Sequence, residues 1–261
     1  MDFAAELRQE QLDESLFRAA GWGKLEAARA ALAEGASVHA RSDSFDTPLH
    51  LAAETGSEEV CALLLGAGAR LDGFNRKGYS PLHAAAVRSE LGCCKLLIEA
   101  GADVNLQNDE GEAPLHAAGA AKNPDVVRLL ATSGVDFSLR DSHGFSPLHY
   151  AALHGTVESA RVLVDSGLSP SEVPSVSGEF CLTPFQRALK YGCFEMVRYF
   201  VLECAESLDQ LTPDGRTLEQ LADRRAETLE VLRALATEVT IAQAAGVGAG
   251  VPARKSGLSP L

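Results

Sequence analysis

Thr47-Pro48-Leu49-His50 is the stretch of sequence that decides the fold, because it returns at a fixed spacing. Three copies follow at steps of 33 residues, a fifth follows after 37 residues and a weaker sixth after 34. These copies are Ser80-Pro81-Leu82-His83, Ala113-Pro114-Leu115-His116, Ser146-Pro147-Leu148-His149, Thr183-Pro184-Phe185-Gln186 and Thr217-Leu218-Glu219-Gln220. A second marker keeps the same 33-residue phase, at Gly35, Gly68, Gly101, Gly134 and Gly167. Two registers that agree over most of the chain predict a repeat architecture.

Each repeat predicts two helices and a connection. A Thr or Ser before Pro is a typical helix start, since the hydroxyl caps backbone N–H groups and Pro occupies a position where its missing N–H costs nothing. The first helix carries paired small residues, such as Ala52-Ala53, which allow close packing. The second helix has apolar residues at helical spacing and ends at the phased glycine. The polar stretch after it, for example 103–112, predicts a turn or hairpin.

This combination of motif and period resembles the ankyrin-repeat family. The resemblance covers residues 11–236 and is highly specific for the fold. It implies an all-α repeat solenoid of helix-turn-helix units with β-hairpin connections, which binds other proteins. It says little about which function the chain performs, because a fold does not determine a function.

The repeats divide the chain into nine segments. Both end units lack the Pro of the motif, as expected of capping repeats with a polar outer side. The expected segments are an N-terminal extension at 1–10, an N-terminal capping repeat at 11–44, ankyrin repeats at 45–77, 78–110 and 111–143, a repeat with a four-residue insertion at 144–180, a degenerate repeat at 181–214, a C-terminal capping repeat at 215–236 and a disordered tail at 237–261.

Composition narrows the class of protein further. The 261 residues are 46% hydrophobic and 23% charged, which is ordinary for a folded chain. The net charge of -13 argues against nucleic acid and anionic lipid as partners and favours basic or apolar protein surfaces. The sequence shows no signal peptide and no apolar run long enough to cross a bilayer. We therefore expect a monomeric cytoplasmic protein that also has access to the nucleus.

Histidines and cysteines are the residues that invite a chemical interpretation. His50, His83, His116 and His149 recur in phase, so neighbours are separated by about 10 Å, too far to share one metal ion. Gln186 takes the same position in a later copy, which favours a hydrogen-bonding role. The six cysteines fit neither a disulfide framework nor a zinc motif. We expect reduced thiols, no cofactor, no metal and no enzymatic activity.

Surface positions at fixed repeat geometry are the candidates for partner binding. The residue before the helix cap and the residue four positions after the cap vary from repeat to repeat. The binding candidates among them are Asp46, Leu51, Tyr79, Glu112, Phe145, Tyr150, Leu182 and Arg187. Tyr79 and Phe145 are the best anchors, with Tyr150 expected beside Phe145, because large aromatic side chains dominate interface energetics. The alternative is that each ring packs against the adjacent hairpin.

Two further features lie outside the regular pattern. The additional four residues of one repeat fall in Ser169–Leu182, and we expect this Pro- and Ser-rich segment to project and help to select the partner; simple tolerance of an insertion is the alternative. The resemblance also implies possible hydroxylation of Asn105, since asparagines in this hairpin context are hydroxylated in some ankyrin proteins.

The function predicted from the sequence is that of a scaffold or adaptor that binds partner proteins on the concave surface of the repeats. One alternative is a direct inhibitor of a signalling or transcription protein. Another is a substrate adaptor of a ubiquitin-ligase complex. The sequence leaves these alternatives open.

Overall fold

The computed structural model describes residues 3–174, 181–222 and 226–244, and the chain divides into two compact units, 1–167 and 168–261. The described residues form fourteen helices and no strands. Those of the first unit are α1 (Phe3–Gly21), α2 (Leu25–Ala33), α3 (Pro48–Glu54), α4 (Glu58–Gly66), α5 (Pro81–Arg88), α6 (Leu91–Glu99), α7 (Pro114–Ala120), α8 (Pro124–Ala131), α9 (Pro147–His154) and α10 (Val157–Asp165). The predicted all-α repeat solenoid is confirmed.

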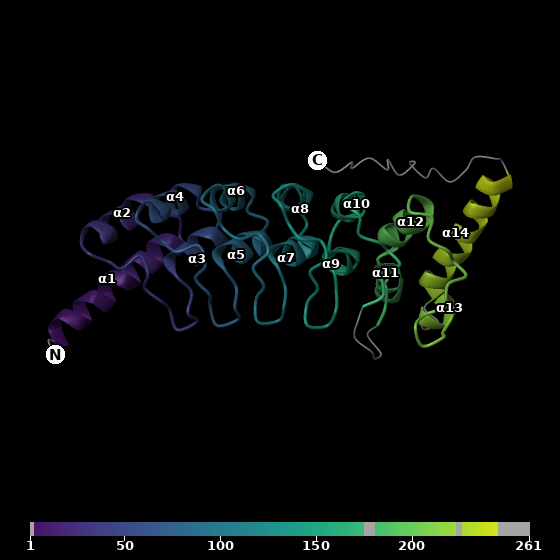
Figure 1. Ribbon diagram of the computed structural model, residues 1–261, viewed down its shortest axis with the longest axis horizontal. Helices are drawn as coiled ribbons and strands as arrows, with labels where there is room; N and C mark the ends of the chain where they lie inside the picture. The colour runs from purple at the N-terminus through teal and green to yellow at the C-terminus, as the bar shows by residue number, and fades with distance from the viewer. Residues whose placement is uncertain (1–2, 175–180, 223–225, 245–261) are drawn as a thin grey trace, which may run out of the picture. The chain divides into compact units, whose positions relative to one another are not determined.

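The first unit has two helical layers. Helices α3, α5, α7 and α9 form an inner row, and α4, α6, α8 and α10 form an outer row above them, while the connecting loops project on the other side of the inner row (Figure 1). Within each row, a helix packs against the equivalent helix of the next repeat, as α7 does against α9. Each repeat therefore buries its apolar faces mainly against its neighbours.

The core consists of leucines and small residues at repeat-equivalent positions. The paired alanines of the inner helices, such as Ala52 and Ala53, are fully buried, so that neighbouring helices can approach closely. One leucine in each helix of the two rows is at most 1% exposed: Leu49, Leu64, Leu82, Leu97, Leu115, Leu130, Leu148 and Leu163. A chain with few aromatic residues fills its interior by this regular interdigitation.

Helix ends follow the sequence signals. The Ser80 hydroxyl accepts from the His83 N–H at 3.4 Å, and the Thr183 hydroxyl accepts from the Gln186 N–H at 3.2 Å. The phased glycines that end the second helices all have a left-handed φ, for example +94° at Gly101. Hydroxyl capping is therefore confirmed at Ser80 and Thr183, and helix termination is confirmed at the phased glycines.

Connections between repeats are turns rather than β-hairpins. Within one loop the Asn75 N–H donates to the Tyr79 carbonyl and the Gly78 N–H to the Asn75 carbonyl, both at 3.0 Å. Successive loops are joined by main-chain bonds, as from the Arg76 N–H to the Ser44 carbonyl at 2.8 Å. Among the described residues the β-pairing is limited to one isolated bridge between Leu211 and Thr217. These turns are too short for ladders, but the bonds between them hold the loops in a row.

Both ends differ from the predicted segments. Helix α1 runs without interruption from Phe3 to Gly21, so residues 3–10 belong to the first helix of the cap and are not a separate extension. Helix α14 continues to Ala244, so residues 237–244 are helical where we predicted a disordered tail. The rest of the predicted tail, 245–261, lies outside the described residues.

The second unit continues the two-helix pattern with α11 (Pro184–Tyr191) and α12 (Phe194–Leu202), followed by α13 (Leu218–Leu221) and α14 (Ala226–Ala244). Phe185 and Phe200 are fully buried and meet edge-on, with ring centroids 6.4 Å apart. Larger side chains thus replace the leucines of the first unit. None of the described helices in either unit is long and apolar enough to cross a membrane.

Candidate functional site

The column of repeated histidines is structural. In the first full repeat, Nδ1 of His50 accepts from the Thr47 N–H at 3.1 Å, which leaves its Nε2–H to donate to the Tyr79 carbonyl of the next repeat at 2.9 Å. His83 joins Ser80 to the carbonyl of Glu112 in the same way. His50, His83 and His116 therefore each bond their own helix start to the following loop.

Burial keeps these imidazoles neutral. It lowers the pKa of His83 to about 4 and also lowers the pKa of His50 and His116, outweighing the bonds to backbone carbonyls. Gln186 makes equivalent contacts, accepting from the Thr183 N–H at 3.2 Å and donating to the Leu211 carbonyl at 3.1 Å. The predicted hydrogen-bonding role is therefore confirmed at these positions.

Glu112 organises a polar cluster that joins three repeats. One carboxylate oxygen accepts from the Tyr79 hydroxyl at 3.1 Å and from Nδ2 of Asn108 at 2.7 Å, and the other accepts from the Tyr150 hydroxyl at 2.7 Å. The same Tyr150 hydroxyl also lies 2.6 Å from Asp141. Because a phenol has one proton, Tyr150 donates to one carboxylate at a time. We call these five residues the Glu112 cluster.

Burial and acidic neighbours act on the tyrosines of the Glu112 cluster. Burial first, and Glu112 second, raise the pKa of Tyr79 to about 12. Burial and the bonds to Asp141 and Glu112 raise the pKa of Tyr150 as well. Both phenols therefore remain donors at neutral pH. This supports the alternative that each tyrosine packs against an adjacent loop, whereas their direct contact with a partner stays a prediction.

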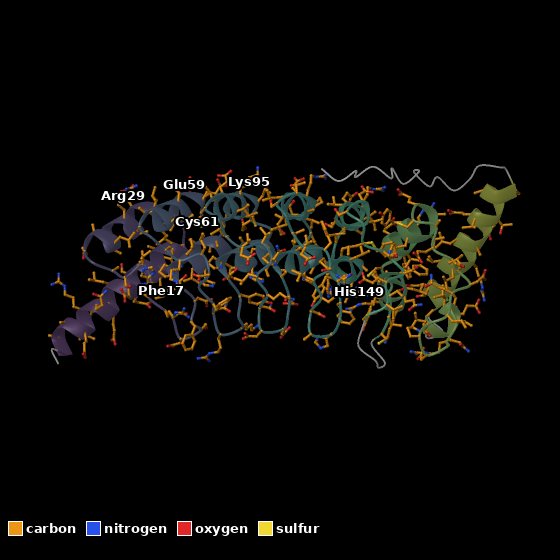
Figure 2. The ribbon with its side chains drawn as sticks, in the orientation of Figure 1. Phe17, Arg29, Glu59, Cys61, Lys95 and His149 are labelled. Atoms are coloured by element: carbon orange, nitrogen blue, oxygen red, sulfur yellow. The ribbon has the colours of Figure 1, made fainter. Side chains whose placement is uncertain are left out.

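Phe145 is held differently. Its ring stacks on His143 with centroids 5.9 Å apart and lies 5.2 Å from the ring of His149. Tyr150 instead meets His116 edge-on at 5.7 Å and turns its hydroxyl toward the Glu112 cluster. Figure 2 shows His149 in the inner row, close to the loops. Phe145 is half-buried, and its role as an anchor stays a prediction.

A hollow opens between the first two full repeats. Its volume is about 340 Å³, and both loops and both inner helices α3 and α5 contribute to it. Its lining residues define what we call the groove: Ser44, Asp46, His50, Glu54, Asn75, Arg76, Lys77, Tyr79, Ala84, Val87 and Arg88. The groove thus contains two of the sequence-predicted candidates, Asp46 and Tyr79.

The groove combines an apolar floor with charged edges. Val87 is 46% exposed beside the half-buried Ala84. At one end Nε of Arg88 donates to Glu54 at 3.0 Å across the two repeats. At the loop end Asp46 accepts from Nδ2 of Asn75 at 2.9 Å. An exposed apolar surface bounded by both charge signs can accept a side chain from a partner and fix its orientation.

Phe45 lies beside the groove and was not among the predicted residues. It occupies the loop position that holds Gly78, Gly111 and Gly144 in later repeats, and its φ is +63°. A bulky residue rarely adopts this left-handed conformation, so the site is strained. The ring is 47% exposed, with the Arg76 guanidinium 5.7 Å above it. The 33-residue phase alone could have revealed this residue, as the only aromatic in a column of glycines.

The remaining candidates are placed by the structure as follows. Leu51 is half-buried on α3. In the second unit Leu182 is 4% exposed, which makes it a core residue, and Arg187 is half-buried on α11. Asn105 is tied to the next repeat, since its side-chain oxygen accepts from the Asp136 N–H at 2.7 Å. Hydroxylation of Asn105 remains a proposal.

Part of the predicted insertion, 175–180, lies outside the described residues. Ser171 and Val173, in the first half of the insertion, line a second hollow of about 510 Å³ within the second unit. Val173 and Leu211 give this hollow an apolar side and are 54% and 58% exposed, while Ser171 donates to Glu206. Whether the insertion selects a partner stays a prediction.

Comparison with known families agrees with the repeats. A family model described as "Ankyrin repeats (3 copies)" matches residues 16–108 and 86–174, and one described as "Ankyrin repeats (many copies)" matches 148–201. The search among curated proteins finds no match. Since the first model alone covers more than half of the chain, this protein belongs to the ankyrin-repeat family. Ankyrin repeats are generally modules of protein–protein interaction and are typically non-catalytic.

Proposed function

We propose that this protein is a non-catalytic scaffold or adaptor, and that its groove receives an exposed side chain or short segment of a partner protein. The observation that carries this proposal is the groove itself, where Val87 is exposed and Tyr79 is half-buried, together with the exposed Phe45 beside it. Exposed aliphatic and aromatic surface next to a concavity is typical of the anchor regions of interfaces.

Several properties of the groove favour a protein partner. Its volume of about 340 Å³ suits one or two side chains. Main-chain bonds between loops and the histidine contacts fix the groove before binding, which reduces the ordering cost of association. The overall charge of -13 favours partners with basic surroundings. A monomeric protein in the cytoplasm, with access to the nucleus, is part of the same proposal.

The test is a comparison of captured partners between two charge insertions. Val87→Glu places a carboxylate on the floor of the groove, whereas Ala62→Glu places one at an exposed position of the outer helix α4. We expect Val87→Glu to reduce partner binding at least 10-fold, because it buries an unpaired charge at the interface. Quantitative capture from cell extract, followed by affinity measurement with the recovered partner, provides the readout.

The Ala62→Glu control shows whether a loss of partners is specific to the groove. Ala62→Glu should retain the partners, and circular dichroism should show unchanged helices in both variants. Partners that survive Val87→Glu at full affinity would remove the groove from the function. Attention would then move to the hollow beside Val173 and Leu211.

A further inference from the structure

A pair of cysteines behind the groove has no role in the proposed function. Cys61 on α4 and Cys93 on α6 lie with their sulfur atoms 3.5 Å apart, and both side chains are fully buried. They join the same two repeats whose inner helices line the groove. Figure 2 shows Cys61 between the two helical rows, whereas Glu59 and Lys95 point to the outer edge.

The two cysteines meet because positions that differ by one residue within the repeat face each other across a repeat junction. By the 33-residue period, Cys61 is equivalent to Cys94, yet its neighbour in the structure is Cys93. At the next two repeat junctions, the equivalent pairs of residues are Cys94 with Val126 and Val127 with Ser159. Two sulfur atoms therefore coincide at one repeat junction only, which packing of small apolar residues does not require.

The two thiols differ in acidity. The hydrogen bond from the Cys61 thiol lowers the pKa of Cys93, and the same bond together with burial raises the pKa of Cys61. Cys93 is thus the more readily ionised of the two thiols and the better nucleophile of the pair. Burial raises the pKa of the adjacent Cys94 to about 12, so this third thiol stays protonated.

We propose that Cys61 and Cys93 form a disulfide bond between adjacent repeats when the protein meets a peroxide. The Cys93 thiolate attacks one oxygen of hydrogen peroxide, giving a sulfenic acid and hydroxide. The Cys61 sulfur then attacks the sulfenic sulfur, the S–S bond forms, and the sulfenic oxygen leaves as water. Two thiols are oxidised, and one peroxide is reduced to two waters.

The geometry requires only a small movement. A disulfide has an S–S distance near 2.05 Å, so the sulfur atoms must approach by about 1.5 Å. Helices α4 and α6 are nine residues long and lie in the outer row, and each repeat contacts only its neighbours, so that local opening can separate the two helices. Such opening admits a peroxide molecule, which is little larger than water.

The experiment uses the full chain, reduced and folded, treated with a small molar excess of hydrogen peroxide at pH 7.4. After circular dichroism has confirmed the helices, the protein is unfolded in N-ethylmaleimide and mapped by mass spectrometry. We expect two fewer labelled thiols than the six of the reduced chain and a cross-linked peptide that contains Cys61 and Cys93. Dithiothreitol should reverse both changes.

Variants provide a matched control. Cys94→Ala should keep the cross-link, whereas Cys61→Ala should abolish it and leave Cys93 to oxidise further. The disulfide should also raise the thermal midpoint of the oxidised protein by about 3–10 °C. Six labelled thiols after treatment, or a cross-link that uses another cysteine, would overturn the proposal. The mapping of the wild-type protein decides this even if a variant folds poorly.

Discussion

Two neighbouring regions on the loop side of the first unit are built from the same repeat and differ in how their polar groups are used. In the Glu112 cluster, Tyr79, Tyr150 and Asn108 all direct hydrogen bonds into one buried carboxylate. In the groove Val87 remains exposed instead, as does Phe45 beside it. Side chains that satisfy one another stabilise the array, and a region that leaves apolar surface exposed is available for a partner. The same repeat architecture can therefore serve either purpose.

Acidification should have the largest effect on folding stability, and it acts on buried side chains that are hydrogen-bonded within the protein. Burial depresses the folded pKa of His83 to about 4, below the value near 6.5 of an unfolded histidine. The unfolded chain therefore binds more protons between these values, so stability is present above pH 6.5 and is lost as the pH falls toward 4. Urea unfolding between pH 7.5 and 4.5 measures this, and a His83→Gln variant should show a smaller slope.

His83→Leu should cause the next largest effect. It leaves the Ser80 N–H and the Glu112 carbonyl without their side-chain partner, at a cost of about 2–4 kcal/mol in the free energy of unfolding. His83→Gln should cost less than half as much, since Gln186 makes the same two contacts elsewhere. Equal losses in the two variants would contradict the hydrogen-bonding role.

Glu112→Ala tests the cluster directly. Two phenols and one amide lose their acceptor, and we expect a loss of about 1–3 kcal/mol in the free energy of unfolding. The matched control is Glu110→Ala, two residues away and exposed, which should change stability by less than about 0.5 kcal/mol. Chemical denaturation of both variants gives the measurement. Similar losses would mean that the cluster contributes little.

Phe45→Gly should give the smallest effect on stability, and with the opposite sign. Glycine relieves the left-handed backbone strain, so we expect a gain of about 1 kcal/mol, offset in part by loss of the Arg76 contact. The reciprocal change, Gly78→Ala, should destabilise the protein, since a Cβ atom there would lie 2.5 Å from the Asp109 nitrogen. If Phe45 serves binding, Phe45→Gly is more stable and binds its partner more weakly. Thermal melts measure the change in stability, and the affinity assay with the recovered partner measures the change in binding.

Sequence periodicity predicted the fold because each repeat carries the same capping residues, glycines and apolar positions. The caps at Ser80 and Thr183, the left-handed glycines and the role of Gln186 in place of histidine all follow from local chemistry at known spacing. The ends were harder to predict. Helices α1 and α14 extend beyond the predicted segments, because a terminal helix has no following repeat whose motif would mark its limit.

Candidate residues were predicted less completely than the fold. The column before each cap includes Asp46 and Tyr79, which line the groove, and their role in binding stays a prediction. The same column includes Glu112, which turned out to be the centre of an internal cluster, and Leu182, which is buried. A column marks equivalent positions, but whether a side chain faces solvent or a neighbour depends on what the adjacent repeat presents to it.

By itself, the sequence determined the repeat, its length, its helices and the position of each candidate within them, since these depend on capping, turn chemistry and apolar periodicity along the chain. Tertiary structure alone decided which residues meet across repeats: Tyr150 with Glu112, and Cys61 with Cys93 rather than with its equivalent Cys94. The physical reason is that stacking places side chains of neighbouring repeats against one another with an offset that the 33-residue period does not contain.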